Sequence, residues 1–141
     1  MRLLPAVVLA ALAATTPALA DEAWDTIYGP LQWETDIGDI AVLNLFGEDV
    51  PSPAFMRFFV NGLAADVSGG RGLYHGYWTA TGGDIGCSAQ LIDDLGTKTP
   101  YWGRFSIQFV NSDFPSSWTG LMGDCFDDPE AIVSGVPLYG D

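Results

Sequence analysis

The residue types that could perform nucleophilic chemistry gather in one stretch, "LYHGYWTATGGDIGC", at residues 73–87. It contains His75, the sole histidine of the chain, and Cys87, one of its two cysteines. A histidine beside a free thiol is the arrangement of a nucleophilic cysteine, which acts as a thiolate. Here a glycine-rich turn separates the two residues, and a second cysteine is present to pair with the first. We therefore predict no catalytic residue, with a small hydrolase as an alternative.

Carboxylates gather in a second stretch, "GDCFDDPE", which places Asp124, Asp127, Asp128 and Glu130 close together. Hard cations such as calcium require about six to eight oxygen ligands. The stretch lacks the D-x-[DN]-x-[DN]-G spacing of an EF-hand loop. We predict a solvated acidic turn, no metal site and no cofactor. Whether this acidic patch binds a cation or a protein stays open.

Tryptophan is abundant, and one strand places it beside polar groups that recognise ligands. In "YWGRFSIQF", residues 101–109, alternation sets Trp102, Arg104 and Gln108 on the face opposite the apolar residues. An aromatic ring, a guanidinium and an amide in a row are typical of a recognition surface. The alternative is outer-surface packing, with Trp102 covering a neighbouring strand. The predicted ligand-binding residues are Trp102, Arg104, Gln108, His75 and Tyr77.

The first twenty residues have the order of a secretory signal peptide. Arg2 precedes an apolar run at residues 3–14, which is too short to cross a bilayer as a helix, and "ALA" at 18–20 resembles a cleavage site. Residues 1–20 are therefore predicted to be removed, leaving residues 21–141 as a single domain that is periplasmic or secreted. Nothing after residue 20 is apolar enough to predict a membrane span.

Two cysteines in an exported chain are expected to pair, so we predict a disulfide between Cys87 and Cys125. In the chain-entropy model, closing a loop of this length contributes about 4 kcal/mol to stability.

Charge limits the class of partner. The chain holds 18 acidic residues and five basic ones, of which Arg2 lies in the predicted signal peptide, so four remain against 18 and the mature net charge is −14. Nucleic-acid binding requires clustered Lys and Arg, and there is no such cluster. The predicted partners are a small ligand, a glycan or a basic protein. The alternative is that acidity serves solubility.

Turn residues interrupt the mature chain at short intervals, with "YGP", "DIGD", "SGGRG", "TGGDIG" and "FDDPE" among them. Short runs of Val, Ile, Phe, Tyr and Trp lie between these turns. This pattern predicts an all-β fold, a small antiparallel barrel or sandwich of about seven to eight strands with one disulfide. "GLYHGYW" resembles the Gly-x-Trp pattern of lipocalin-like barrels through Gly76 and Trp78, a resemblance that bears on architecture alone.

Three strands are expected to form a meander at residues 85–93, 101–109 and 118–125, because the links between them are short. Residues 40–46 and 55–60 are apolar on both faces, which predicts strands covered on both sides. In that position Asn44 would need hydrogen-bond partners, and Arg57 an ion pair or a place at an edge. Residues 129–135 could form one helical turn that begins at Pro129.

The composition and motifs together favour an exported domain that acts by binding rather than catalysis. One version binds a ligand or glycan at a barrel mouth or on the Trp102 and Arg104 face. The other is an acidic module that docks a basic partner, such as a cationic hydrolase that it inhibits. The sequence predicts neither the oligomeric state nor the strand order.

Overall fold

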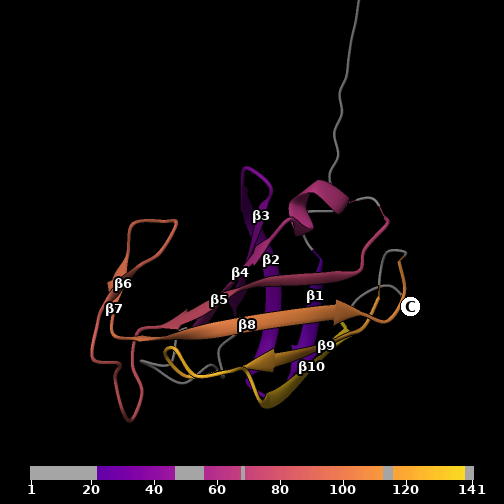
Figure 1. The fold of residues 1–141 in the computed structure, drawn as a ribbon. Helices are drawn as coiled ribbons and strands as arrows, with labels where there is room; N and C mark the ends of the chain where they lie inside the picture. Colours follow the sequence, from indigo (N-terminus) through magenta and orange to yellow (C-terminus); the bar gives the residue numbers. More distant parts are fainter. Residues whose placement is uncertain (1–21, 47–55, 68, 113–115, 139–141) are drawn as a thin grey trace, which may run out of the picture.

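The structure, a computed structural model, describes residues 22–46, 56–67, 69–112 and 116–138. These residues form a closed antiparallel barrel with the strand order β1-β10-β9-β8-β5-β4-β3-β2, in which β1 also pairs with β2 (Figure 1). The all-β class, the barrel and the number of strands are therefore confirmed. The barrel strands are β1 (Ala23–Thr26), β2 (Gly29–Ile37), β3 (Ile40–Leu45), β4 (Met56–Asn61), β5 (Leu73–Ala80), β8 (Tyr101–Phe109), β9 (Trp118–Met122) and β10 (Ala131–Pro137).

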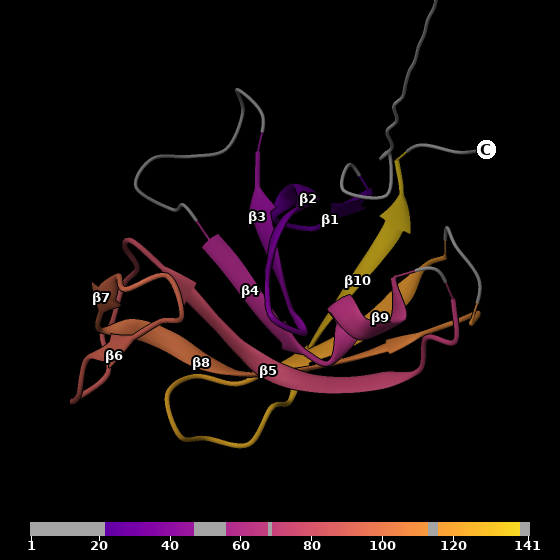
Figure 2. The same cartoon turned by 90° about the horizontal axis from the view of Figure 1, so that it is seen from above.

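Two smaller elements extend the barrel. A 3-10 helix, η2 (Leu63–Asp66), follows β4. A two-stranded hairpin of β6 (Leu91–Ile92) and β7 (Lys98–Thr99) lies between β5 and β8 in the chain. Figure 2 shows this hairpin beside the end of β5 and the start of β8. The hairpin is part of the long connection that positions the candidate sites described below.

The predicted meander is correct for two strands and wrong for the third. β8 and β9 pair antiparallel as expected, with Ile107 opposite Gly120. Residues 85–93 form no barrel strand, and only Leu91–Ile92 is extended and paired. The residues before Leu91 contact the start of β8 through isolated hydrogen bonds. One of these runs from the Cys87 amide to the Pro100 carbonyl at 2.7 Å. β5 takes the place beside β8 instead.

The helical turn predicted at residues 129–135 is also wrong, because this segment closes the barrel. β10 pairs with β9 on one side and with β1 on the other. Two ladders of backbone hydrogen bonds satisfy more peptide groups than one helical turn would. Pro129, which could begin a helix, instead precedes the strand.

Large side chains fill the interior of the barrel. Alternate residues of each strand point inward, and the indole rings of Trp24 and Trp118 meet edge to face with centroids 6.2 Å apart. Trp78 and Trp118 both lie in this core. Because side chains fill the interior, the space open to a ligand lies at the barrel ends and on the outer face. The main core residues are Trp24, Leu31, Trp33, Leu43, Phe58, Tyr74, Trp78, Phe105, Ile107 and Trp118.

β3 and β4 are covered on both faces, as predicted. Val42 and Phe59 point away from the core and are nonetheless fully buried. The ring of Tyr77 stacks on Phe59, with centroids 4.6 Å apart and planes 8° apart. Arg57 forms an ion pair, as expected, whereas the buried amide oxygen of Asn44 has no hydrogen-bond partner among the described residues.

A buried ion pair ties the start of the described chain to the barrel core. The guanidinium of Arg71 donates to both carboxylate oxygens of Glu22, at 2.7 and 2.9 Å, and to the Val67 carbonyl at 2.9 Å. Both charged side chains are almost wholly inaccessible to solvent. The guanidinium also lies 5.6 Å from the ring centroid of Trp33 and 5.3 Å from that of Phe109, within cation–π range.

Gly76 lies where β4 and β5 approach each other closely, so it provides a sharp stability test. A Cβ at this position would lie 1.8 Å from the carbonyl oxygen of Phe59. Gly76→Ala is therefore expected to lower the free energy of unfolding by about 3 kcal/mol, because the backbones must separate. Gly72→Ala is the matched control, since nothing lies within 4 Å of its Cβ. Urea unfolding that gives equal values for both variants would contradict this prediction.

Candidate functional site

The predicted disulfide is present and joins two loops at one end of the barrel. Cys87, in the connection between β5 and β8, is bonded to Cys125, which follows β9, with an S–S distance of 2.03 Å. The Cys125 amide donates to the Trp102 carbonyl at 2.9 Å, so the second loop is attached to β8. Cys125 has φ of 57°, the left-handed conformation that few residues other than glycine adopt. The bridge thus holds an irregular loop against a regular strand.

Two indole groups hold these loops in place. Trp78 Nε1 donates to the Gly123 carbonyl at 2.8 Å, and Trp102 Nε1 donates to the Ala89 carbonyl at 2.9 Å. Trp102 lies on the outer face of β8, as alternation predicts, but only 6% of its surface is exposed. The ring of Phe126 covers it edge to face, with centroids 4.9 Å apart. Trp102 is therefore not an open surface, and of the two environments expected for it, exposure or a pocket, the structure places it in the lining of a pocket.

A cavity of about 430 Å³ lies between the two loops and the start of β8. Ligand pockets in proteins usually measure about 300–1,000 Å³. We call this space the disulfide cavity. Its lining residues are Trp78, Gly82, Gly83, Asp84, Ile85, Cys87, Tyr101, Trp102, Asp124, Cys125 and Asp127.

The disulfide cavity combines aromatic rings with negative charge. Its lining includes three aromatic side chains and three aspartates, and neither Lys nor Arg. The negative potential of carboxylates on a concave wall attracts cations, and the faces of aromatic rings attract them further. No group of three or more His, Cys, Asp or Glu side chains in the described ranges is arranged to hold a metal ion.

Four of the five residues predicted to bind a ligand lie together on the outer face of β5 and β8, outside this cavity. Tyr77 is opposite Arg104 in the strand register, His75 lies two residues from Tyr77 on β5, and Gln108 lies four residues from Arg104 on β8. Arg104 is exposed and lies 3.4 Å from a carboxylate oxygen of Asp128. These four side chains thus share an open surface, and Trp102 alone of the predicted set lines the disulfide cavity.

Tyr77 anchors the β6–β7 hairpin to the barrel. Its hydroxyl donates to the Asp94 carboxylate and accepts a hydrogen bond of 2.9 Å from the Asp94 amide. Burial and the hydrogen bond to Asp94 raise the pKa of the Tyr77 hydroxyl, so it stays protonated and remains a donor at neutral pH. The hairpin is consequently fixed over the outer face of β4 and β5.

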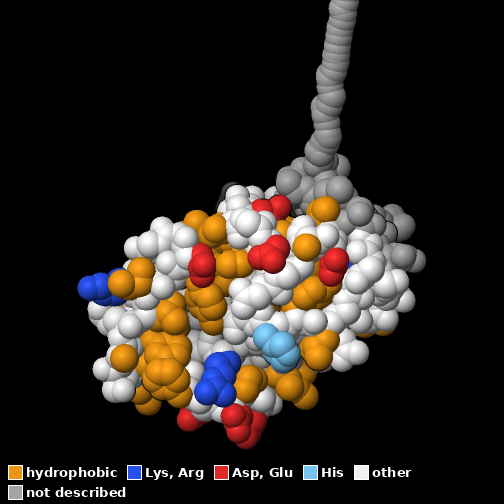
Figure 3. Space-filling model, turned by 45° about the horizontal axis from the view of Figure 1, so that its top comes forward, with side chains coloured by type: hydrophobic (Ala, Val, Ile, Leu, Met, Phe, Trp, Pro, Cys, Tyr) orange, Lys and Arg blue, Asp and Glu red, His pale blue; other side chains and the backbone are white. Residues whose placement is uncertain are grey.

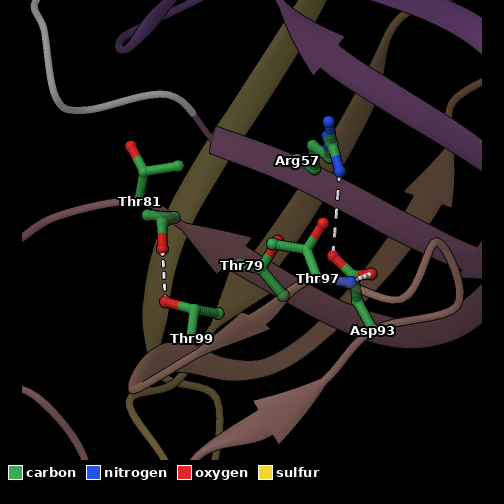
Figure 4. A pocket seen from close by; sticks show the side chains of 7 residues that line it. Arg57, Thr79, Thr81, Asp93, Thr97 and Thr99 are labelled. Carbon is green, nitrogen blue, oxygen red and sulfur yellow. Dashed lines mark hydrogen bonds and ion pairs between the residues drawn. The ribbon is translucent and has the colours of Figure 1, made fainter.

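A second, smaller cavity of about 50 Å³ lies between this hairpin and the barrel. We call it the threonine cavity, since four of its lining residues are threonines. Figure 4 shows the Arg57 guanidinium and the Asp93 carboxylate pointing toward each other, with nitrogen and oxygen 3.8 Å apart. The sequence indicated that Arg57 needs a partner but did not indicate Asp93, which lies in a short link. The lining residues are Arg57, Thr79, Ala80, Thr81, Asp93, Thr97 and Thr99.

The face of the molecule drawn in Figure 3 carries both acidic and basic side chains. Figure 3 shows carboxylates scattered over one side of the molecule, with apolar and uncharged polar groups between them.

Among the residues that the structure describes, no helix has the length and apolar character needed to cross a membrane. No protein-family model matches the chain, and neither a curated protein nor a solved structure shows significant similarity to it.

Proposed function

We propose that the chain is an exported, non-catalytic binding domain that takes an organic cation into the disulfide cavity. The observation that carries this proposal is the composition of the cavity wall. Trp78, Tyr101 and Trp102 offer apolar ring surface, while three aspartates supply negative charge without a competing Lys or Arg. A quaternary or primary amine on an apolar body complements both features.

Export rests on separate observations. Residues 1–20 have the order of a signal peptide, and the disulfide between Cys87 and Cys125 is of the kind that persists in oxidising compartments. We expect the mature protein to be periplasmic or secreted and to begin at Asp21. The mass of the protein recovered from the envelope or medium of expressing cells tests this point.

A basic protein is the second candidate ligand. Two apolar side chains beside the carboxylates favour it: Ile85, which lines the cavity, is 88% exposed, and Phe126, which contacts Trp102, is 69% exposed. Exposed apolar groups around a charged pocket are typical of protein interfaces. In this version a Lys or Arg side chain of the partner enters the cavity.

The test is a titration with benzyltrimethylammonium followed by tryptophan fluorescence. We expect saturable binding of this cation and weaker binding as salt rises, because salt screens the aspartates. Benzyl alcohol and benzoate, which carry the same ring with no charge or a negative charge, should not bind. Equal binding of all three probes, or no binding of the cation, would contradict the proposal.

Paired variants locate the site. Replacing Asp84 and Asp127 by Asn should weaken binding of the cation about threefold to tenfold, as expected for exposed charges. Replacing Asp25 and Glu34 by Asn and Gln removes the same charge from exposed positions on β1 and β2 and should leave the affinity unchanged. Displacement of the probe by oligolysine, but not by cellobiose, would favour the basic partner over the glycan.

A further inference from the structure

The carboxylate of Asp93 is buried, and only one of its two oxygens is satisfied by hydrogen bonds. The Oδ1 atom accepts hydrogen bonds of 2.9 Å from the amides of Leu95 and Thr97, which closes the turn of the β6–β7 hairpin. The Oδ2 atom receives no hydrogen bond from the described residues. Only 1% of the Asp93 side chain is exposed. A buried acceptor on a charged group costs about 1–3 kcal/mol or more when it lacks a donor.

Asp93 lines the threonine cavity together with Arg57. The shortest distance between the guanidinium and Oδ2 is 3.8 Å, which is longer than a hydrogen bond. A small group beside these two atoms, within hydrogen-bond distance of both, would donate to Oδ2 and accept from the guanidinium. Asp93 disfavours an anion in this position and Arg57 disfavours a cation, so the group that fits is neutral and both donates and accepts.

A hydroxyl is the neutral group that both donates and accepts through one atom. The cavity measures about 50 Å³, and a single water needs about 10–15 Å³ of such space. The cavity therefore accommodates a hydroxymethyl group, which has two heavy atoms. The lining supplies surface for its carbon atom, because threonine side chains carry a methyl group beside the hydroxyl.

We propose that the threonine cavity is a binding site for a hydroxymethyl group of a polyol or carbohydrate. The hydroxyl donates to Asp93 Oδ2 and accepts from the Arg57 guanidinium, while the rest of the ligand stays outside the cavity. This site is separate from the disulfide cavity, since the two share no lining residue.

The test is a titration of the isotope-labelled protein with glycerol and ethylene glycol, followed by the amide NMR signals of Leu95 and Thr97. These amides report on the site because they donate to the other oxygen of the Asp93 carboxylate. We expect saturable shifts with both probes. 1,2-Dimethoxyethane resembles ethylene glycol but lacks hydroxyl donors and should give none. Shifts that do not saturate, or that are the same for the ether, would overturn the proposal and leave a cavity that holds water alone.

Asp93→Asn is the deciding variant. Asparagine keeps the Oδ1 acceptor that closes the turn and replaces Oδ2 by a donor, so glycerol should bind about tenfold more weakly or not at all. Asp25→Asn removes one exposed carboxylate from β1 and should bind glycerol normally. Unchanged glycerol binding in Asp93→Asn would overturn the proposal. Asp93→Asn should not change the binding of benzyltrimethylammonium. The proposal for the threonine cavity and the proposal for the disulfide cavity can therefore fail independently of each other.

Discussion

Arg71→Met is expected to lower the free energy of unfolding by about 3–5 kcal/mol, because it leaves the carboxylate of Glu22 buried without its partner. The guanidinium supplies two hydrogen bonds to that carboxylate and one to the Val67 carbonyl. Methionine fills much of the same volume between Trp33 and Phe109, so the loss comes mainly from the uncompensated charge. Urea unfolding at neutral pH measures it.

The pH dependence of this loss identifies its cause. Burial raises the pKa of Glu22, and the hydrogen bond and charge of Arg71 partly oppose that rise. In Arg71→Met the hydrogen bond and the positive charge that lower the pKa of Glu22 are gone. The pKa of Glu22 in the folded state therefore lies further above its value in the unfolded state. The folded state then binds a proton that the unfolded state releases, and stability is recovered as pH falls through the raised pKa. A deficit that is constant between neutral pH and pH about 4 would contradict this explanation.

Arg104→Met is the control for the buried pair. Arg104 is also paired with a carboxylate, that of Asp128, but both side chains are exposed. Exposed pairs contribute about 0–1 kcal/mol, so this variant should unfold almost as the natural protein does. If Arg71→Met and Arg104→Met lowered the free energy of unfolding equally, burial of the Arg71–Glu22 pair would not explain its contribution to stability.

Removal of the disulfide is expected to lower the free energy of unfolding by a similar amount and to weaken cation binding as well. The bridge spans a sequence separation of 38 residues, and replacing Cys87 and Cys125 by Ser should lower the free energy of unfolding by about 4 kcal/mol. The two loops that line the disulfide cavity would then keep the indole hydrogen bonds of Trp78 and Trp102 and a few backbone hydrogen bonds to the start of β8, without a covalent link between them. We expect the folded variant to bind benzyltrimethylammonium much more weakly.

The two consequences of removing the bridge can be separated. Urea unfolding gives the stability of the double serine variant, and the titration is performed at a temperature where it is fully folded. Addition of reductant to the natural protein should reproduce both changes. A folded, reduced protein that binds the cation as tightly as the oxidised protein does would show that the bridge has no part in forming the cavity.

Strand periodicity predicted much of the barrel because one face of a strand points into the core and the other points outward. β8 alternates between buried and exposed residues from Gly103 to Phe109, and this period of two is visible in the sequence. Residues 85–93 show the same alternation, yet their structure is set by the disulfide and by contacts of Cys87 and Ala89 with the start of β8. A local pattern does not reveal those long-range contacts.

The candidate sites were only partly predictable for the same reason. The polar residues near Trp102 in the sequence identified it as a candidate. The sequence did not indicate that Phe126, from the loop after β9, packs over its ring. Asp93 and Arg71 lie in segments whose composition indicates turns, and their importance comes from partners distant in the chain, Arg57 and Glu22. Buried charges in turn sequences give no periodic signal.

The most direct test of the proposed function is a crystal structure of the protein with 4-bromobenzyltrimethylammonium, located by the anomalous scattering of bromine. We predict one bromine site within the disulfide cavity beside Tyr101 and Trp102, with the ammonium group toward the aspartates. A bromine site elsewhere on the barrel, or an empty cavity under conditions where the compound saturates the protein in solution, would contradict the account.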